Sequence, residues 1–143
     1  MFILQESPID ISQAKNMCNN PANGALVSFE GIVRADKHNG GIVSELLYIA
    51  DTKLVLQEGE KIIQEALSSF SITEAVCIQR IGQLKTSETA VWIGVWAPHR
   101  DEAFKSCRYL IEEIKKRLLI WKKEFYTDGS SKWLQRPQTL SIF

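Results

Sequence analysis

The chain has 143 residues, 45% of them hydrophobic and 24% charged, and its 17 basic and 17 acidic side chains give a formal net charge of zero. This composition is typical of one ordinary globular domain, here over residues 1–143, which needs neither a metal ion nor disulfides for stability. It excludes intrinsic disorder and a membrane-spanning helix, because no apolar run approaches about 20 residues, and it argues against a nucleic-acid binder held by bulk charge.

The charges are divided unequally along the chain. Residues 1–79 carry 5 basic and 10 acidic side chains, and residues 80–143 carry 12 basic and 7 acidic ones. The two halves therefore have formal charges of −5 and +5. Either chance on a mixed surface or a division into an acidic and a basic face would produce this pattern.

The three cysteines and two histidines are isolated from one another. Cys18, Cys77 and Cys107 have no Cys-x-x-Cys spacing, and the last two lie in apolar periodic segments, where buried thiols are expected. His38 and His99 are equally isolated, so no metal site is predicted. The N-terminus lacks the pattern of a signal peptide, and a cytoplasmic location, where thiols stay reduced, fits best.

The first third of the chain predicts strands around one short helix. A short apolar strand over residues 2–5 precedes a helix over residues 9–18. Residues 25–34 and 42–50 are rich in strand-forming side chains. The loop over residues 36–41 carries an Asn-Gly pair, which favours an antiparallel hairpin between these two strands.

The rest of the chain predicts two amphipathic helices with strands between them. Residues 53–69 and 103–118 carry apolar side chains at helical spacing. Residues 72–81 and 89–97 predict strands joined by a turn over residues 82–87. A short strand at Trp133 follows a later Asp-Gly turn.

The order of these elements, β-α-β-β-α-β-β-α-β, determines the predicted fold class. Hairpins that alternate with helices favour an α+β fold with an antiparallel or mixed sheet over a doubly wound parallel sheet. Neither a Gly-x-Gly-x-x-Gly fingerprint nor a phosphate-binding Gly-Lys-Ser/Thr loop occurs, so nucleotide-binding folds that need those loops are not expected.

Basic residues mark the candidate sites. His99 and Arg100 lie where a strong strand meets a strong helix, and the free N–H groups at a helix start favour an anion, which an Arg can clamp. Lys115 and Lys122 are seven residues apart and would share one face of a continuous helix. Positive neighbours and burial lower the pKa of a lysine, which suits a proton donor, a proton acceptor or a nucleophile.

Ordinary alternatives stay open for each of these residues. A helix start can carry a surface Arg and a capping His, and a run of lysines is usually a solvated helix end. Arg34, at the end of a strand beside a Gly-rich loop, is a weaker candidate. Trp121 and Trp133 either wall a pocket for a flat heterocycle or anchor the C-terminal segment.

Five segments, in order between about residues 24 and 134, carry a family resemblance. They are residues 24–34 (GALVSFEGIVR), 80–84 (RIGQL), 97–104 (APHRDEAF), 115–124 (KKRLLIWKKE), and the Asp128-Gly129 turn with Trp133. Together they resemble the large (catalytic) subunit family of molybdopterin synthases. Leu118-Leu119 stand where that family usually has Ala-Pro, Ile49-Ala50-Asp51 replace its Glu-x-Tyr, and Ser87 takes the place of a common turn Gly.

The resemblance implies a fold and an activity. The fold would be an α/β-hammerhead with an additional small β subdomain, in a homodimer that forms a heterotetramer with a small ubiquitin-like subunit. The activity would be sulfur transfer in molybdenum cofactor biosynthesis, converting cyclic pyranopterin monophosphate (precursor Z) to molybdopterin. The sulfur would come from a thiocarboxylate on the C-terminal glycine of the small subunit, whose tail enters a pocket of the large one. No metal or other cofactor is implied for this step, and neither nucleic acid nor a membrane is an expected partner.

The resemblance also implies roles for individual residues. Lys115 and Lys122 would be the catalytic lysines, with Lys115 beside the thiocarboxylate, assisting proton transfer and attack. Lys122 would support the same chemistry and the bound pterin.

Five further positions are implied to contact substrate. His99 and Arg100 would hold it, and Arg34 would be another contact that could be donated across the dimer. Lys123 and Glu124 are weaker candidates for the same role.

Two alternative functions stay open. The chain could be a non-catalytic binding module that retains the fold and the partner site, although keeping both lysines, His99 and Arg100 argues against this. It could also be a phosphate-ligand transferase of unrelated chemistry, because a fold alone does not determine function.

Overall fold

The computed structural model describes residues 1–38 and 41–134. This part of the chain has three helices, and its nine strands form two sheets. The first sheet has the strand order β1-β5-β7-β2, with β1 parallel to β5 and the other pairs antiparallel. Its strands are β1 (Phe2–Gln5), β5 (Glu74–Arg80), β7 (Thr89–Ala97) and β2 (Ala25–Ile32). The predicted α+β class and mixed sheet are therefore confirmed.

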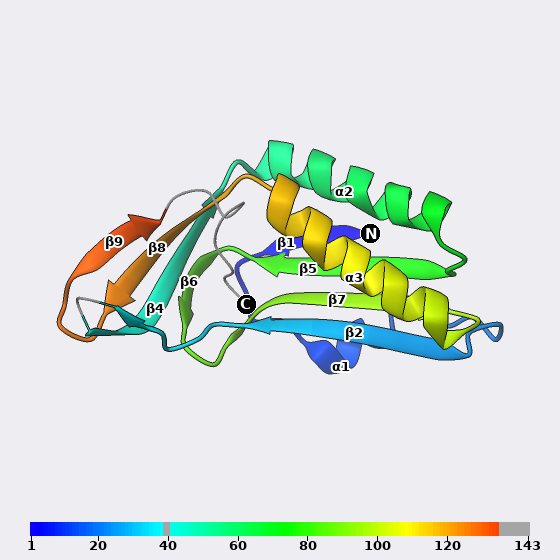
Figure 1. Cartoon of the computed structure of the whole chain (residues 1–143), viewed down its shortest axis with the longest axis horizontal. Coiled ribbons are helices and arrows are strands. Elements are labelled where there is room, and N and C mark those ends of the chain that lie inside the picture. The colour runs from blue at the N-terminus through cyan, green and yellow to red at the C-terminus, as the bar shows by residue number, and fades with distance from the viewer. Residues whose placement is uncertain (39–40, 135–143) are drawn as a thin grey trace.

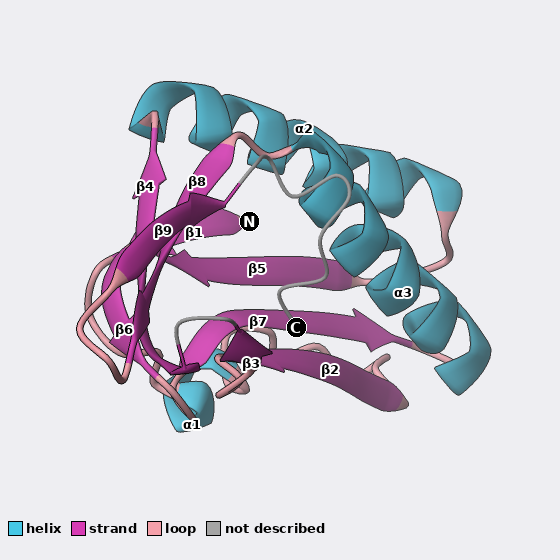
Figure 2. Ribbon diagram, turned by 60° about the vertical axis from the view of Figure 1, so that its left-hand side comes forward, coloured by secondary structure: helices cyan, strands magenta, loops and turns pink. Residues whose placement is uncertain are grey.

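Helices cover both faces of the first sheet. The helices are α1 (Ile11–Ala14), α2 (Thr52–Ser69) and α3 (Arg100–Arg117). Helices α2 and α3 lie across one face and α1 lies on the other (Figure 1, Figure 2). Alternate strand residues enter two apolar clusters, with Cys77 and Ile93 in the larger one and Ile78 and Trp92 in the smaller. Burial on both faces explains why β5 and β7 are almost unbroken apolar runs.

The second sheet stands at one end of the first (Figure 1). Its strands are β3 (Lys37–His38), β4 (Gly41–Ala50), β8 (Ile120–Tyr126) and β9 (Ser131–Leu134), in that order, with β6 (Gly82–Lys85) on the other side of β4. All its pairs are antiparallel. This sheet matches the additional small β unit that the resemblance implies.

The predicted hairpin between residues 25–34 and 42–50 is wrong. Strand β2 pairs with β7 instead, with Phe29 opposite Ile93, and β4 pairs with β6 and β8. The Asn39-Gly40 pair that suggested the hairpin lies outside the described residues. A local turn signal therefore did not identify the pairing partners, which depend on contacts far apart in sequence.

Two other predicted segments differ from the structure. Residues 82–87 are not only a turn, because Gly82–Lys85 form the strand β6. The helix predicted over residues 9–18 is limited to the four residues of α1. Ser87 has a φ of 74°, the one positive φ outside glycine in the described part of the chain, which explains why a glycine would suit this turn.

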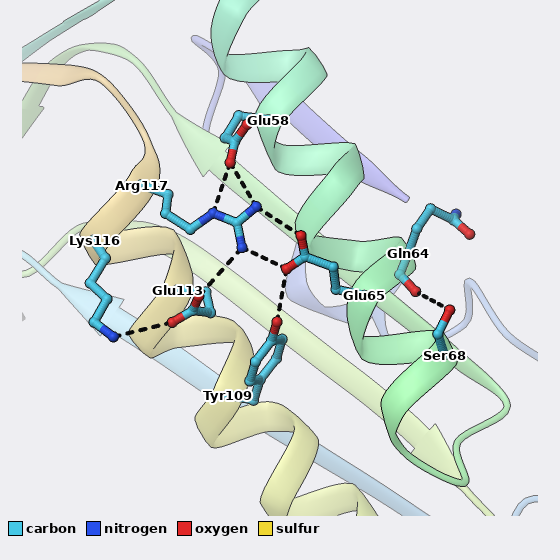
Figure 3. A network of polar contacts seen from close by, with 8 residues as sticks. All are labelled: Glu58, Gln64, Glu65, Ser68, Tyr109, Glu113, Lys116 and Arg117. Atoms are coloured by element: carbon cyan, nitrogen blue, oxygen red, sulfur yellow. Dashed lines mark hydrogen bonds and ion pairs between the residues drawn. The ribbon is translucent and has the colours of Figure 1, made fainter.

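Arg117, in the last turn of α3, joins this helix to α2 (Figure 3). Its Nε donates to Glu58 Oε1 at 2.7 Å and its Nη2 to Glu65 Oε2 at 2.9 Å, while Nη1 contacts Glu113 Oε1 at 3.3 Å. The Tyr109 hydroxyl donates to Glu65 as well, at 2.8 Å. Hydrogen bonds from Arg117 and then Tyr109 lower the pKa of Glu65 to about 2. Acidic side chains from the first half of the sequence thus meet a basic one from the second.

Candidate active site

Lys115 and Lys122 lie on different elements. Lys115 is in the last turn of α3, and Lys122 is on β8. The helix ends at Arg117, and the next residue, Leu118, already has an extended backbone with φ −77° and ψ 129°. The shared helix face predicted from the seven-residue spacing is therefore wrong. The turn into β8 instead brings Lys122 near enough to Lys115 for one charge to lower the pKa of the other.

Burial is the strongest influence on Lys122. It lowers the pKa of this lysine to about 8, because a buried ammonium group loses hydration. The carboxylates of Glu124 and Asp36 oppose the shift, and the positive charges of Arg34 and Lys115 add to it. An amine with this pKa exchanges a proton near neutral pH, as a general acid or base must.

Lys122→Met is expected to increase the free energy of unfolding at about pH 7, because it removes a partly buried charge. The pKa of Lys122 falls from an ordinary 10.5 to about 8 on folding. The unfolded chain therefore binds more protons between these pH values, and the wild type gains stability as pH rises through them. Urea unfolding of both proteins near pH 7 and pH 10 should show a smaller difference at the higher pH. A constant difference would contradict this sign.

Arg34 lies beside both lysines within the same chain. Partial burial lowers the pKa of Lys115, Glu112 opposes this, and the charge of Arg34 lowers it further. Arg34 also forms an ion pair with Asp36, with 3.4 Å between Nη2 and Oδ2. We call Arg34, Lys115 and Lys122 the basic cluster. Asp36 was missed from the sequence, where its only signal was a position two residues after Arg34.

Lys123 and Glu124 face opposite sides of β8, because successive strand residues alternate. Glu124 shares the face of Lys122, is 4% exposed and accepts a hydrogen bond from the Tyr126 hydroxyl at 3.2 Å. Lys123 lies on the other face, with its Nζ 5.3 Å from the centre of the Trp133 ring. The structure therefore places Glu124 beside the basic cluster and Lys123 outside it.

A groove of about 430 Å³ runs between β2 and α3. Its apolar lining includes Phe29, Ile111 and Phe104, and the last of these residues is 62% exposed. Cys107 also contributes to the lining, but it is buried, and this burial raises the pKa of its thiol to about 11. Lys115 is the last α3 residue of the lining. The groove thus combines apolar walls with an ammonium group, which suits an extended apolar segment with an anionic end.

His99 and Arg100 lie at the opposite end of α3 from Lys115. His99 is the N-cap residue, with an extended backbone and no capping hydrogen bond from its side chain, and Arg100 begins the helix. Both side chains are exposed. Fifteen residues separate Arg100 from Lys115, which at about 1.5 Å per residue is roughly 22 Å along the helix. Within one chain these two predicted contacts therefore do not converge with the basic cluster.

Within residues 1–38 and 41–134, no three His, Cys, Asp or Glu side chains are arranged to hold a metal ion. No helix in the same residues is both long enough and apolar enough to cross a bilayer. Cys18, Cys77 and Cys107 are all unpaired, and the last two are buried as predicted.

Comparisons with known proteins identify relatives along most of the chain. The family model described as MoaE protein matches residues 4–117. A curated relative from Pyrococcus abyssi, named molybdopterin synthase catalytic subunit, is 36% identical over 141 residues, which covers 99% of this chain and 94% of the relative.

Solved structures agree with the sequence relatives. The crystal structure of molybdopterin synthase from Staphylococcus aureus is similar with a TM-score of 0.87 and 34% identity, over 93% of this chain and 96% of that one. A chain from the complex of subunits 1 and 2 of molybdopterin-converting factor from Helicobacter pylori shares the fold, with a TM-score of 0.72 and 18% identity over 94% and 90% of the two chains. The chain described here therefore belongs to the MoaE protein family, as the resemblance predicted.

Proposed function

We propose that this protein is the catalytic subunit of a molybdopterin synthase. It transfers sulfur from the thiocarboxylated C-terminus of a small ubiquitin-like subunit to cyclic pyranopterin monophosphate, forming the dithiolene of molybdopterin. The observation that carries the proposal is the basic cluster, in which two lysines of lowered pKa, one from a helix and one from a strand, lie together with an arginine from a loop. Membership of the MoaE family and the names of the relatives support it.

The groove and the basic cluster have complementary roles in this proposal. The apolar walls of the groove hold the extended tail of the small subunit, and Lys115 pairs with its negatively charged thiocarboxylate. Arg34 and Lys122 hold the anionic pterin, and Lys122 exchanges protons as the sulfur attacks. Release of the sulfur leaves a carboxylate on the small subunit, whose new oxygen comes from water. The residues of this chain supply charge and proton transfer, and no metal or other cofactor is part of the proposal.

A homodimer with a small subunit bound to each protomer is the proposed assembly. His99 and Arg100 lie roughly 22 Å along α3 from Lys115, so they reach a basic cluster only if a second protomer supplies them. The Helicobacter pylori complex, which pairs a chain of this fold with another subunit, supports the heteromeric part. The unpaired cysteines support the expected cytoplasmic location.

Reconstitution tests the proposed function directly. The purified protein is mixed with a thiocarboxylated small subunit and precursor Z, and dithiolene product is measured. Product is expected only when all three components are present. If the protein binds the small subunit but forms no product, it is a non-catalytic binding module, and the proposal is wrong.

A further inference from the structure

Tyr48, on β4, carries a buried hydroxyl group for which the sequence analysis had no role. Its side chain is 1% exposed, and its hydroxyl forms no hydrogen bond to any residue in the described part of the chain. Buried polar groups are nearly always paired, and an unpaired one destabilises the fold, a penalty that phenylalanine would avoid at the same position. A tyrosine at this position therefore calls for an explanation beyond folding.

The sheet places Tyr48 beside Lys122. Tyr48 pairs with Gly82 on β6 and with Lys122 on β8, and directly opposite residues of an antiparallel pair have side chains on the same face. Glu124 is on this face too, since it is two residues further along β8 and opposite Leu46. Gly82 carries no side chain, so the charged side chain directly opposite Tyr48 is that of Lys122 on β8.

Glu124 is the charged group that acts on the Tyr48 hydroxyl. Burial raises the pKa of Tyr48, and the negative charge of Glu124 raises it further, so the hydroxyl stays protonated and can donate. One oxygen of Glu124 already accepts a hydrogen bond from Tyr126 at 3.2 Å. Lys122 is the neighbouring cation whose pKa this carboxylate raises.

We propose that Tyr48 is a positioning residue for Lys122. The Tyr48 hydroxyl donates a hydrogen bond to the Glu124 carboxylate whenever Lys122 is neutral. A buried carboxylate is unfavourable when a neighbouring cation loses its charge, and a nearby donor compensates for that loss. The hydroxyl is thus unpaired when Lys122 is charged, and it gains a hydrogen bond when Lys122 is neutral. This inference rests on the proposed function only in treating Lys122 as a group that must lose and regain a proton.

Other charged and titratable groups act on the same lysine and must stay constant in the test. They are Arg34 and Asp36 from the loop between β2 and β3, Tyr48 from β4, Lys115 from α3 and Glu124 from β8. A single hydroxyl deletion leaves all the charges unchanged. Any change in the titration of Lys122 then reports the hydrogen bond that the hydroxyl makes.

Tyr48→Phe tests the proposal without requiring turnover. The titration of the Lys122 Nζ is followed by NMR on lysine-labelled protein, in wild type, in Tyr48→Phe and in the control Tyr109→Phe. The Tyr109 hydroxyl bonds to Glu65, which is not among the groups that shift the pKa of Lys122. Removing the donor disfavours neutral Lys122, so its titration is expected to move up by about one pH unit in Tyr48→Phe. It should not move in Tyr109→Phe.

Stability and activity give two further readouts. The urea midpoint should rise in Tyr48→Phe, because an unpaired hydroxyl is removed, and fall in Tyr109→Phe, because a hydrogen bond is lost. In the reconstituted enzyme, the pH profile of Tyr48→Phe should shift upward by the same unit as the titration. Adding Tyr48→Phe to Glu124→Gln should produce no further shift, since the acceptor charge is already gone.

The inference is overturned if Lys122 titrates at the same pH with and without the Tyr48 hydroxyl. That result differs from a failure of the proposed function, which would be seen as absence of product with the wild type. A shift of equal size in the Glu124→Gln background would also overturn it, because Glu124 would then not be the acceptor.

Discussion

Lys115→Ala is expected to lower the rate of dithiolene formation by at least about a hundredfold, because a positioned proton-transfer group contributes about 10²–10⁴ in rate. The protein should still fold, since Lys115 is only partly buried. Single turnovers with excess thiocarboxylated subunit measure the effect. Lys116→Ala is the matched control, because Lys116 is exposed and forms an ion pair with Glu113 on the helix surface at 3.5 Å. Full activity in Lys115→Ala, or an equal loss in both variants, would contradict the assignment.

The same variant tests whether two protomers share a site. Arg100→Ala should also be inactive alone, and an equal mixture of Arg100→Ala and Lys115→Ala chains should regain about one quarter of wild-type activity. Half of randomly paired dimers contain one chain of each kind, and one of their two sites then has both residues intact. The two chains must exchange partners for this activity to return, so the mixture is unfolded and refolded, or the two variants are coexpressed. If Arg100 acted on Lys115 of its own chain, no intact site would form and no activity would return.

Arg117→Met is expected to have the largest effect on stability, a loss of about 3 kcal/mol. It leaves the carboxylates of Glu58, Glu65 and Glu113 facing one another without their shared cation. Removing one partner of a buried ion pair costs about 3–5 kcal/mol, and the loss here is at the lower end of this range because these side chains are only partly buried. Urea unfolding near neutral pH measures the loss. Arg108→Met is the control, because Arg108 is exposed and pairs with Glu112 on the helix surface, where such pairs contribute less than about 1 kcal/mol.

The acid limb of the stability curve gives an independent check on Arg117. The pKa of Glu65 falls from an ordinary 4.5 to about 2 on folding, so this carboxyl contributes stability above pH 4.5 that is lost as the pH falls toward 2. In Arg117→Met most of this dependence should disappear. If stability falls equally steeply with decreasing pH in the wild type and in Arg117→Met, Arg117 is not what lowers the pKa of Glu65.

Apolar patterns predicted the elements with the most buried surface. Helices α2 and α3 follow the predicted segments within a few residues because their apolar side chains recur at helical spacing, and strands β5 and β7 do so because they are short runs of strand-forming apolar residues. The partner of β2 could not be predicted in this way. Its register with β7 joins Phe29 to Ile93, more than sixty residues later, and depends on the tertiary fold.

The candidate site was predicted less from spacing than from resemblance. The seven-residue interval between Lys115 and Lys122 suggested one helix, although the chain turns into β8 between them. Family motifs identified both lysines and Arg34, which the fold does bring together. Asp36 and Tyr48 have no motif of their own, and their proximity to Lys122 depends on a loop and a strand pairing that local sequence does not determine.

The buried cysteines have a consequence for the sulfur chemistry. Burial raises the pKa of Cys107, in the lining of the groove, to about 11, and burial also raises the pKa of Cys77. Both therefore remain protonated thiols at neutral pH, and a thiol in this form is a poor nucleophile. A thiocarboxylate bound in the groove therefore meets no thiolate from Cys107 that could attack its carbonyl carbon, form a thioester and release the sulfur as sulfide.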